Sequence, residues 1–347
     1  MRNREQNRAL AMSILLLTLM GHCTKDGRMN SANHDPTRAL LLQSLLQASS
    51  DSAFNEILMQ HGRIQEYEVP EITDGTTSGS GSRRYYATQA LTLAGTAKAH
   101  AVLRQRVKDT PDIRVWAVAI DAVLESEPEL ARARPELIDH ALKSDDGMIL
   151  AAGLRAAAKI KHPGLSAALE QALGHKDWKV RLAAAGAASG SEALLRAHLG
   201  QEQNEAVLGA MVKSLARSQD ATTWAEIQQA LARADRYQSE ALYAALQHAP
   251  GPRAKELLLH VAQNPGPQRK LALHTLFSLP ADADTVRVAI AIYERTPPRD
   301  APDFREFASA QEPCDTFLSN LAGRAIRGAE ALSFAHQWLA SRSAPTE

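Results

Sequence analysis

From residue 83 onward, small and apolar residues recur with the spacing of one side of a helix. In each unit an anchor residue is followed, three and six positions later, mostly by small or apolar residues, as in Arg181, Ala184 and Ala187. Such offsets fall on one helix face, and a small residue there lets two helices pack closely. The anchors follow one another at steps of 26 to 36 residues: Arg84, Arg114, Leu150, Arg181, Val207, Gln238 and Arg269.

A break and a second amphipathic stretch follow each of these first helices. Most breaks contain glycine or proline, such as Gly95, Gly190 and Pro280, which end one helix and start the next. The pattern predicts second helices over residues 98–107, 135–142, 165–173, 192–199, 223–234, 254–262 and 285–293.

A helix pair of this length cannot bury its apolar face alone, whereas stacked pairs bury a continuous core. No run of residues shows convincing two-residue alternation with β-branched enrichment, so no sheet is expected. The 62 alanines among 347 residues also suit closely packed helices. The chain is therefore predicted to be an all-α protein, an α-α superhelix (solenoid) of about seven helix-pair repeats. The repeats cover residues 83–297, and residues 298–347 form a C-terminal helical cap.

The residues before the repeats predict further helices and a loop. Leucines and other apolar residues between 37 and 60 predict two short helices, with Asp51 or Ser52 capping the second. They belong to an N-terminal helical segment over residues 37–69. Residues 70–82 are rich in Gly, Ser and Thr and predict a flexible linker loop.

The N-terminus has the features of an export signal. Arg2, Arg4 and Arg8 precede an uncharged run of twelve residues, which is too short to span a bilayer as a helix. This arrangement is typical of a secretory signal peptide over residues 1–22. The polar residues 23–36 are then predicted to form a tether.

The segment that ends at Cys23 resembles the lipid-attachment site of bacterial lipoproteins, although Met20 and His22 differ from the family's pattern. The resemblance implies a lipid anchor at Cys23 and an exported protein, either periplasmic or anchored to a membrane. The alternative is a short buried helix at the start of a cytoplasmic protein.

The unit around Asp177 is the clearest repeat, with Val180, Arg181 and Ala184 following at fixed spacing. It resembles the HEAT-repeat family in its short bacterial form, and the resemblance covers about residues 83–297. It implies that Asp and Arg lie at the turns between helices, where Asp caps a helix and accepts from the Arg of a neighbouring unit. The residues implied for this ladder are Asp177, Arg181, Arg114 and Arg269.

Charge and composition indicate few candidate binding or catalytic sites. Basic and acidic residues both number 39, so no basic excess indicates a nucleic-acid partner. Metal motifs of the His-Glu-x-x-His and Cys-x-x-Cys types and the Gly-x-Ser-x-Gly elbow are absent, so no metal, cofactor or catalytic residue is predicted. Cys314 is predicted at the start of a helix, which would lower the pKa of its thiol. A buried packing role for Cys314 is the favoured alternative.

These observations favour a non-enzymatic interaction scaffold that binds a protein partner through the concave face of the stack, formed by the second helices. Tryptophans are enriched where partners bind. The candidate contact residues are Trp178, Trp224, Arg104, Arg196, Gln228 and Glu256. Alternatives are an enzyme or chaperone-like lyase on the same frame, resembling bilin lyases or DNA glycosylases, and a lipoprotein that serves only as a spacer. The sequence indicates neither the identity of the partner nor the oligomeric state.

Overall fold

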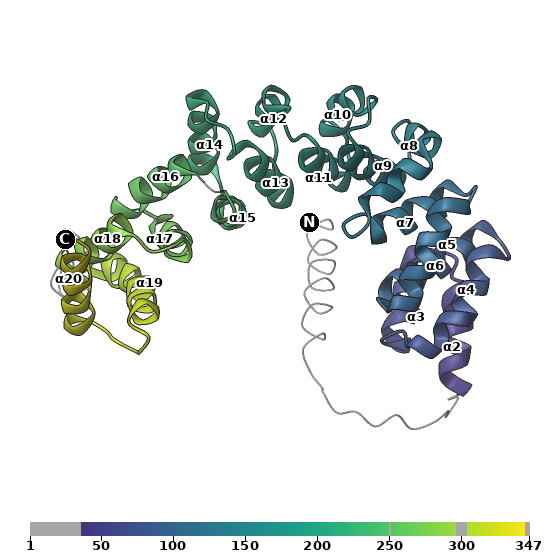
Figure 1. Ribbon diagram of the computed structural model, residues 1–347, viewed down its shortest axis with the longest axis horizontal. Helices are drawn as coiled ribbons and strands as arrows, with labels where there is room; N and C mark the ends of the chain where they lie inside the picture. The colour runs from purple at the N-terminus through teal and green to yellow at the C-terminus, as the bar shows by residue number, and fades with distance from the viewer. Residues whose placement is uncertain (1–35, 250, 265, 296–303, 344–347) are drawn as a thin grey trace.

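The computed structural model describes residues 36–249, 251–264, 266–295 and 304–343. Over these residues the regular elements are all helices, and they follow one another along an arch (Figure 1). The predicted all-α solenoid is therefore confirmed. The predicted signal segment, Cys23 and the tether up to residue 35 lie outside the described residues.

Helix pairs form the body of the arch, in the order and number that the sequence predicts. The first helices of the pairs are α5 (Gly81–Ala94), α7 (Ile113–Val123), α9 (Gly147–Ile160), α11 (Trp178–Ala187), α13 (Glu205–Leu215), α15 (Arg236–Gln247) and α17 (Arg269–Ser278). The second helices are α6 (Ala97–Asp109), α8 (Pro135–Ala141) with the short η3 (Pro128–Ala133) before it, α10 (Leu165–Leu173), α12 (Glu192–Leu199), α14 (Ala221–Arg233), α16 (Pro252–Gln263) and α18 (Ala283–Glu294).

Helices outside the pairs continue the stack at both ends. At the N-terminal end lie α2 (Pro36–Leu46), α3 (Asp51–His61), the short η2 (Glu66–Glu68) and α4 (Val69–Thr77). At the other end, α19 (Phe304–Ala322) packs on α17, and α20 (Ala329–Ser343) packs on α18. The C-terminal helices therefore take the place of one more pair.

The two rows of helices have different places on the arch. In Figure 1, α11, α13 and α15 lie along its inside, and α10, α12 and α14 along its outside. This is the reverse of the sequence expectation, which put the second helices on the concave face. The first helices carry the smaller packing residues and approach more closely; a Cβ at Gly209 of α13 would lie 3.3 Å from the carbonyl oxygen of Ala241 in α15. The row with the shorter spacing forms the inside of the curve.

A shared register runs through five of the seven first helices because an Asx side chain caps the N-terminus of each; α5 is capped by Ser80, and no side chain caps α17. Asp112, Asp146, Asp177, Asn204 and Asp235 are the N-caps of α7, α9, α11, α13 and α15, and each side chain accepts a backbone N–H of the first turn. We number positions in these helices from the N-cap, so that position 7 of α9 is Gly153.

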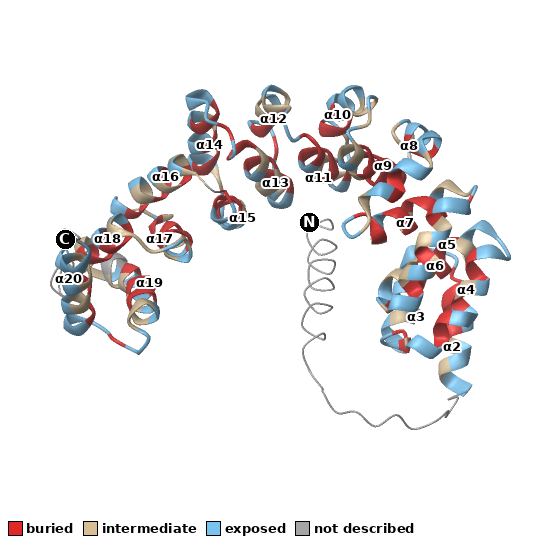
Figure 2. Ribbon diagram, in the orientation of Figure 1, coloured by how far each residue is buried: buried red, intermediate tan, exposed pale blue. Residues whose placement is uncertain are grey.

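The core lies between the two rows (Figure 2). Positions 7 and 11 of the five capped first helices are buried throughout: Ala119, Gly153, Ala184, Met211 and Leu242, then Val123, Ala157, Ala188, Leu215 and Leu246. Two clusters of buried apolar residues, which meet in α9, thus run along the arch, and each pair contributes to at least one of them and contacts mainly its neighbours.

The N-terminal part corrects two sequence expectations. Residues 70–82 are predicted to be a flexible linker, but most of them belong to α4 and the start of α5. Ile72 is fully buried there, and Gly75 lets α4 approach α5, because a Cβ at Gly75 would lie 3.0 Å from the Cβ of Ala87. Packing thus overrides the local composition. The second correction concerns α3, which is capped by the hydroxyl of Ser50 rather than by Asp51 or Ser52.

Cys314 is also misplaced by the sequence analysis. It lies in the interior of α19 and not at its start, because Pro313 is accommodated within the helix. Its thiol is buried and donates to the carbonyl oxygen of Ala310 at 3.2 Å.

Two glycines of the first row should respond oppositely to alanine. A Cβ at Gly153 would lie 2.7 Å from the Cβ of Ala141, whereas a Cβ at Gly186 meets no atom within 4 Å. We expect Gly153→Ala to lower the free energy of unfolding by about 1–3 kcal/mol through overpacking. Gly186→Ala should raise it by up to about 1 kcal/mol through helix propensity. Urea denaturation of the full chain measures both, and changes of the same sign would contradict this account.

Candidate functional site

The inner face of the arch is formed by positions 2, 9 and 13, which lie about opposite the buried positions 7 and 11 on the helix. These residues are exposed or half-buried in every capped first helix. From α7 to α15, position 2 is Arg114, Met148, Lys179, Ala206 and Tyr237, position 9 is Asp121, Arg155, Gly186, Lys213 and Ala244, and position 13 is Glu125, Lys159, Gly190, Arg217 and His248.

Ion pairs join α7 to α9 across this inner face. Asp121 and Arg155, both at position 9, form a bidentate pair with N–O distances of 2.5 and 2.6 Å. Glu125 and Lys159, both at position 13, pair at 2.9 Å. Like positions therefore face each other across neighbouring first helices, which verifies the register for surface residues as well as for the core.

Two repeats further along, the inner face has cations without carboxylates. Position 9 of α13 is Lys213, and position 13 of the same register is Arg217, two residues beyond the end of the helix; the structure gives neither residue an acidic partner among the described residues. At the same positions after Asp177 stand Gly186, in the last turn of α11, and Gly190, three residues beyond its end; a Cβ at either would meet no atom within 4 Å. The inner face of α11 is thus bare beside two uncompensated positive charges.

An exposed aromatic side chain and a third cation extend this surface. Tyr237, at position 2 of α15, is 62% exposed, and Lys179, at position 2 of α11, has no acidic partner among the described residues. Further along, Lys270 of α17 pairs with Glu312 of α19 at 2.6 Å. The cationic section from α11 to α15 therefore lies between two sections whose charges are paired. We call it the central inner face.

A ladder of polar contacts runs along the turns that precede the first helices. Arg84 donates to the N-cap carboxylate Asp112 at 3.1 Å, and Arg114 donates to the N-cap carboxylate Asp146 at 3.4 Å. These contacts have the form that the HEAT resemblance implies. They stabilise the turns and do not form a ligand site.

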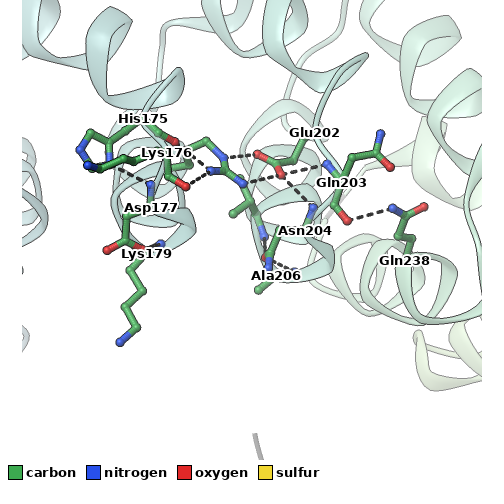
Figure 3. A network of polar contacts seen from close by, with 11 residues as sticks. His175, Lys176, Asp177, Lys179, Glu202, Gln203, Asn204, Ala206 and Gln238 are labelled. Atoms are coloured by element: carbon green, nitrogen blue, oxygen red, sulfur yellow. Dashed lines mark hydrogen bonds and ion pairs between the residues drawn. The ribbon is translucent and has the colours of Figure 1, made fainter. Parts of the chain in front are cut away.

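Arg181 forms the most buried arginine–carboxylate pair of the ladder, with Glu202, which is labelled in Figure 3. It donates to both carboxylate oxygens of Glu202, at 2.7 and 3.0 Å, and to the carbonyl oxygen of His175 at 2.8 Å. Asp177 does not take part as an acceptor of this arginine; it caps α11 by accepting from the backbone N–H of Lys179. At the turn before α13, the carboxylate of Glu202 therefore accepts the arginine in place of an N-cap carboxylate.

The pKa of Glu202 lies below its ordinary value. Burial alone would raise it, but the Arg181 guanidinium and the backbone N–H groups of Asn204 and Gln203 stabilise the carboxylate more strongly. A carboxyl with a lowered pKa stabilises the folded state above its unfolded-state pKa, and this contribution is lost as the pH falls through the lowered value.

Arg269 is part of the predicted ladder but has different contacts. Its side chain is buried, and its Nε donates to the carbonyl oxygen of Ala262 at 3.0 Å across the turn before α17. This hydrogen bond thus stabilises the turn that precedes the helix of Arg269 itself.

The predicted partner-contact residues are not brought together. Trp224 is 5% exposed and donates its indole N–H to the carbonyl oxygen of Ser218, so it belongs to the core. Arg104 pairs with Glu127 at 2.6 Å, and Arg196 pairs with Asp220 at 3.0 Å.

The other predicted contact residues differ in exposure. Gln228 of α14 and Glu256 of α16 are exposed on second helices. Trp178 begins α11 and is half-buried against the core. The central inner face escaped the sequence analysis, which had no means to tell which row of helices lies inside.

The sequence analysis also missed a buried charge cluster in the N-terminal helices. Arg38 donates to both carboxylate oxygens of Glu68 at 2.8 and 3.0 Å, and Nε2 of His61 lies 3.0 Å from the same carboxylate. Glu68 also accepts the backbone N–H of Gln65. The cluster joins α2, the end of α3 and η2, and no sequence spacing signals it because its members are 23 and 30 residues from Arg38.

Other chemistry is limited. Burial, followed by the charge of Asp315, raises the pKa of the Cys314 thiol, so this cysteine is not activated. Among the described residues, no group of three or more His, Cys, Asp or Glu side chains is arranged to hold a metal ion. No helix in the described ranges has both the length and the apolar character needed to cross a membrane.

Comparison with protein-family models and with curated proteins gives no match. Among solved structures, the crystal structure of an engineered protein is similar over 89% of this chain and 99% of its own, with 14% sequence identity and a TM-score of 0.40. No activity or partner follows from these comparisons.

Two ladder arginines should differ in their effect on stability. Arg181→Ala leaves the carboxylate of Glu202 buried without its cation, and we expect a loss of about 3 kcal/mol in the free energy of unfolding at neutral pH. Arg114→Ala removes an exposed pair and should cost about 1 kcal/mol or less. The penalty for Arg181→Ala should shrink as the pH falls through the lowered pKa of Glu202. Denaturation of both variants tests this, and equal losses would refute the assignment of Arg181 as the stronger contact.

Proposed function

We propose that this protein is a non-enzymatic interaction scaffold that binds a protein partner through the inner face of its arch. A stack of helix pairs offers an extended curved surface, the usual binding surface of solenoid proteins. The observation that carries the proposal is the central inner face, with uncompensated Lys213 and Arg217 beside the bare inner face of α11. The exposed ring of Tyr237 adds the kind of side chain that is enriched at binding hot spots.

We assign the repeats to the HEAT-like type. Asp112 and Asp146 cap their helices and accept from the arginine of the preceding repeat, as the family's turns imply. Arg181 keeps its place in the turn and uses Glu202 as the acceptor. These contacts support the assignment, and the unit around Asp177 remains its best sequence match.

We further propose that the scaffold works at the cell envelope, exported and held there by a lipid on Cys23. The support is the basic, then apolar, N-terminal sequence that ends at this cysteine. The alternative is a cytoplasmic scaffold that keeps residues 1–22. A mass measurement of the protein from its native cell should give a chain that begins at Cys23 and carries added acyl mass; an intact chain from Met1 would overturn the envelope assignment.

The enzyme alternatives have less support. A DNA glycosylase of this architecture needs a basic groove, because neutralisation of several phosphates supplies a large share of the affinity for DNA. The central inner face offers only Lys179, Lys213 and Arg217 without acidic partners. A lyase or chaperone that holds a pigment requires a deep apolar pocket, and the section from α11 to α15 presents glycine, alanine and charge instead.

Site-specific photo-crosslinking tests the proposed binding face. A photo-reactive phenylalanine replaces Ala206 or Ala244 on the inner face, and Gln228 or Glu256 on the outer row serves as the matched control. All four residues are exposed, so the label should be tolerated. We expect a crosslinked species of one defined mass from the two inner positions in the native cell, with the partner identified by mass spectrometry. Crosslinks from the outer positions alone, or from none, would refute binding through the inner face.

A further inference from the structure

We infer that the partner contacts the central inner face with a helix that carries two carboxylates four residues apart. This inference rests on the proposed function and names the chemistry of the partner. The carboxylates are expected beside Lys213 and Arg217, above the bare inner face of α11.

The protein contains its own example of the contact. Asp121 of α7 and Glu125, two residues beyond its end, are four residues apart and pair with Arg155 and Lys159 of α9. Positions 9 and 13 of neighbouring first helices are therefore spaced for carboxylate–cation pairs. A residue and the fourth residue after it lie about 6 Å apart on a helix face, so one helix supplies both carboxylates.

At α13 the two cations of this arrangement are present, but the two carboxylates that would pair with them are not. Lys213 and Arg217 occupy the positions that correspond to Arg155 and Lys159, while Gly186 and Gly190 occupy those that correspond to Asp121 and Glu125. A Cβ at either glycine meets no atom within 4 Å, so no other part of the described chain covers the backbone at these two positions. Charge complementarity thus selects an acidic occupant, which forms pairs of the kind already present two repeats along the arch, between α7 and α9.

A protein helix fits this surface better than a nucleic acid. Three uncompensated cations are too few for the run of phosphate contacts that nucleic-acid affinity requires. An acidic helix needs only the two cations of α13.

Substitution of Gly186 tests the inference within the protein itself. Gly186→Asp places a carboxylate at position 9 of α11, where it should pair with Lys213 as Asp121 pairs with Arg155. It should therefore compete with the partner. Gly186→Asn is the matched control, since it has the same size and no charge. Gly190 is left unchanged because its φ of +91° would strain any other residue.

The probe is a synthetic alanine- and glutamine-rich helical peptide with Asp and Glu four residues apart, titrated into the full chain by fluorescence anisotropy. A peptide with Asn and Gln at those places is the control. We expect the acidic peptide to bind at least about tenfold more tightly than the amide peptide, with an affinity that falls as salt rises. Gly186→Asp and the double variant Lys213→Glu, Arg217→Glu should each weaken binding about tenfold, and Gly186→Asn should not.

The inference is overturned if the two peptides bind equally, if the acidic peptide does not bind at low salt, or if Gly186→Asp and Gly186→Asn behave alike. Displacement of the peptide by a single-stranded oligonucleotide at lower concentration would also overturn it in favour of a nucleic acid. Crosslinking from Ala206 and Ala244 without acidic-peptide binding would leave the proposed function standing and end this inference. Failure of both experiments would end both.

Discussion

The burial of one face of each first helix between its two neighbours is the interaction on which the rest of the arch depends. Positions 7 and 11 have no core within their own pair and become buried through the adjoining pairs. Where such a position is glycine, as at Gly153, a helix of the second row approaches closely: a Cβ at Gly153 would lie 2.7 Å from the Cβ of Ala141 in α8. The register that the N-caps impose on this buried face also fixes which side chains meet on the exposed face.

Much of the fold could be predicted from the sequence because its signals are local. The recurrence of small residues after Arg84, Arg114 and Arg181 marks the first helices, and glycine or proline marks most of the breaks. The predicted second helices coincide with observed ones to within a few residues at each end, as with 165–173 and Leu165–Leu173. The order of the helices, their number in the repeats and the absence of strands from the described residues follow from these signals.

The candidate site could not be predicted because it depends on distances between repeats. Which row lies inside the arch is decided by small differences in helix spacing, and no single repeat contains that information. Trp224 and Arg196 carry the right chemistry for a contact, but their hydrogen bonds to Ser218 and Asp220 occupy them. The prediction of a flexible linker over residues 70–82 was wrong for a related reason. Ile72 and Gly75 pack against α5, and composition alone does not indicate this contact. By contrast, aligning the repeats at their N-cap residues could have shown from the sequence alone that Gly186, Lys213, Asp121 and Arg155 occupy the same position.

The repeat separates stability from recognition by position. Buried positions stay small or aliphatic from α7 to α15, while position 9 changes from Asp to Arg, Gly, Lys and Ala. Each exposed position can change without disturbing the core, because it projects away from the neighbouring helices. The polar ladder at the turns, centred on Arg181 and Glu202, holds neighbouring pairs at a fixed rotation and so keeps the exposed positions aligned.

The uneven distribution of ion pairs has a mechanical consequence. A contact on the inside of a curve is stretched when the curve is straightened, so the pairs of Asp121 with Arg155 and Glu125 with Lys159 act as tension ties between α7 and α9. No such tie joins α11 to α13 at Gly186 and Gly190. A force that pulls the ends of the arch apart therefore meets no inner ion pair at this joint, where the hydrogen bond from Ser214 to the carbonyl oxygen of Ala185 joins α13 to α11 instead.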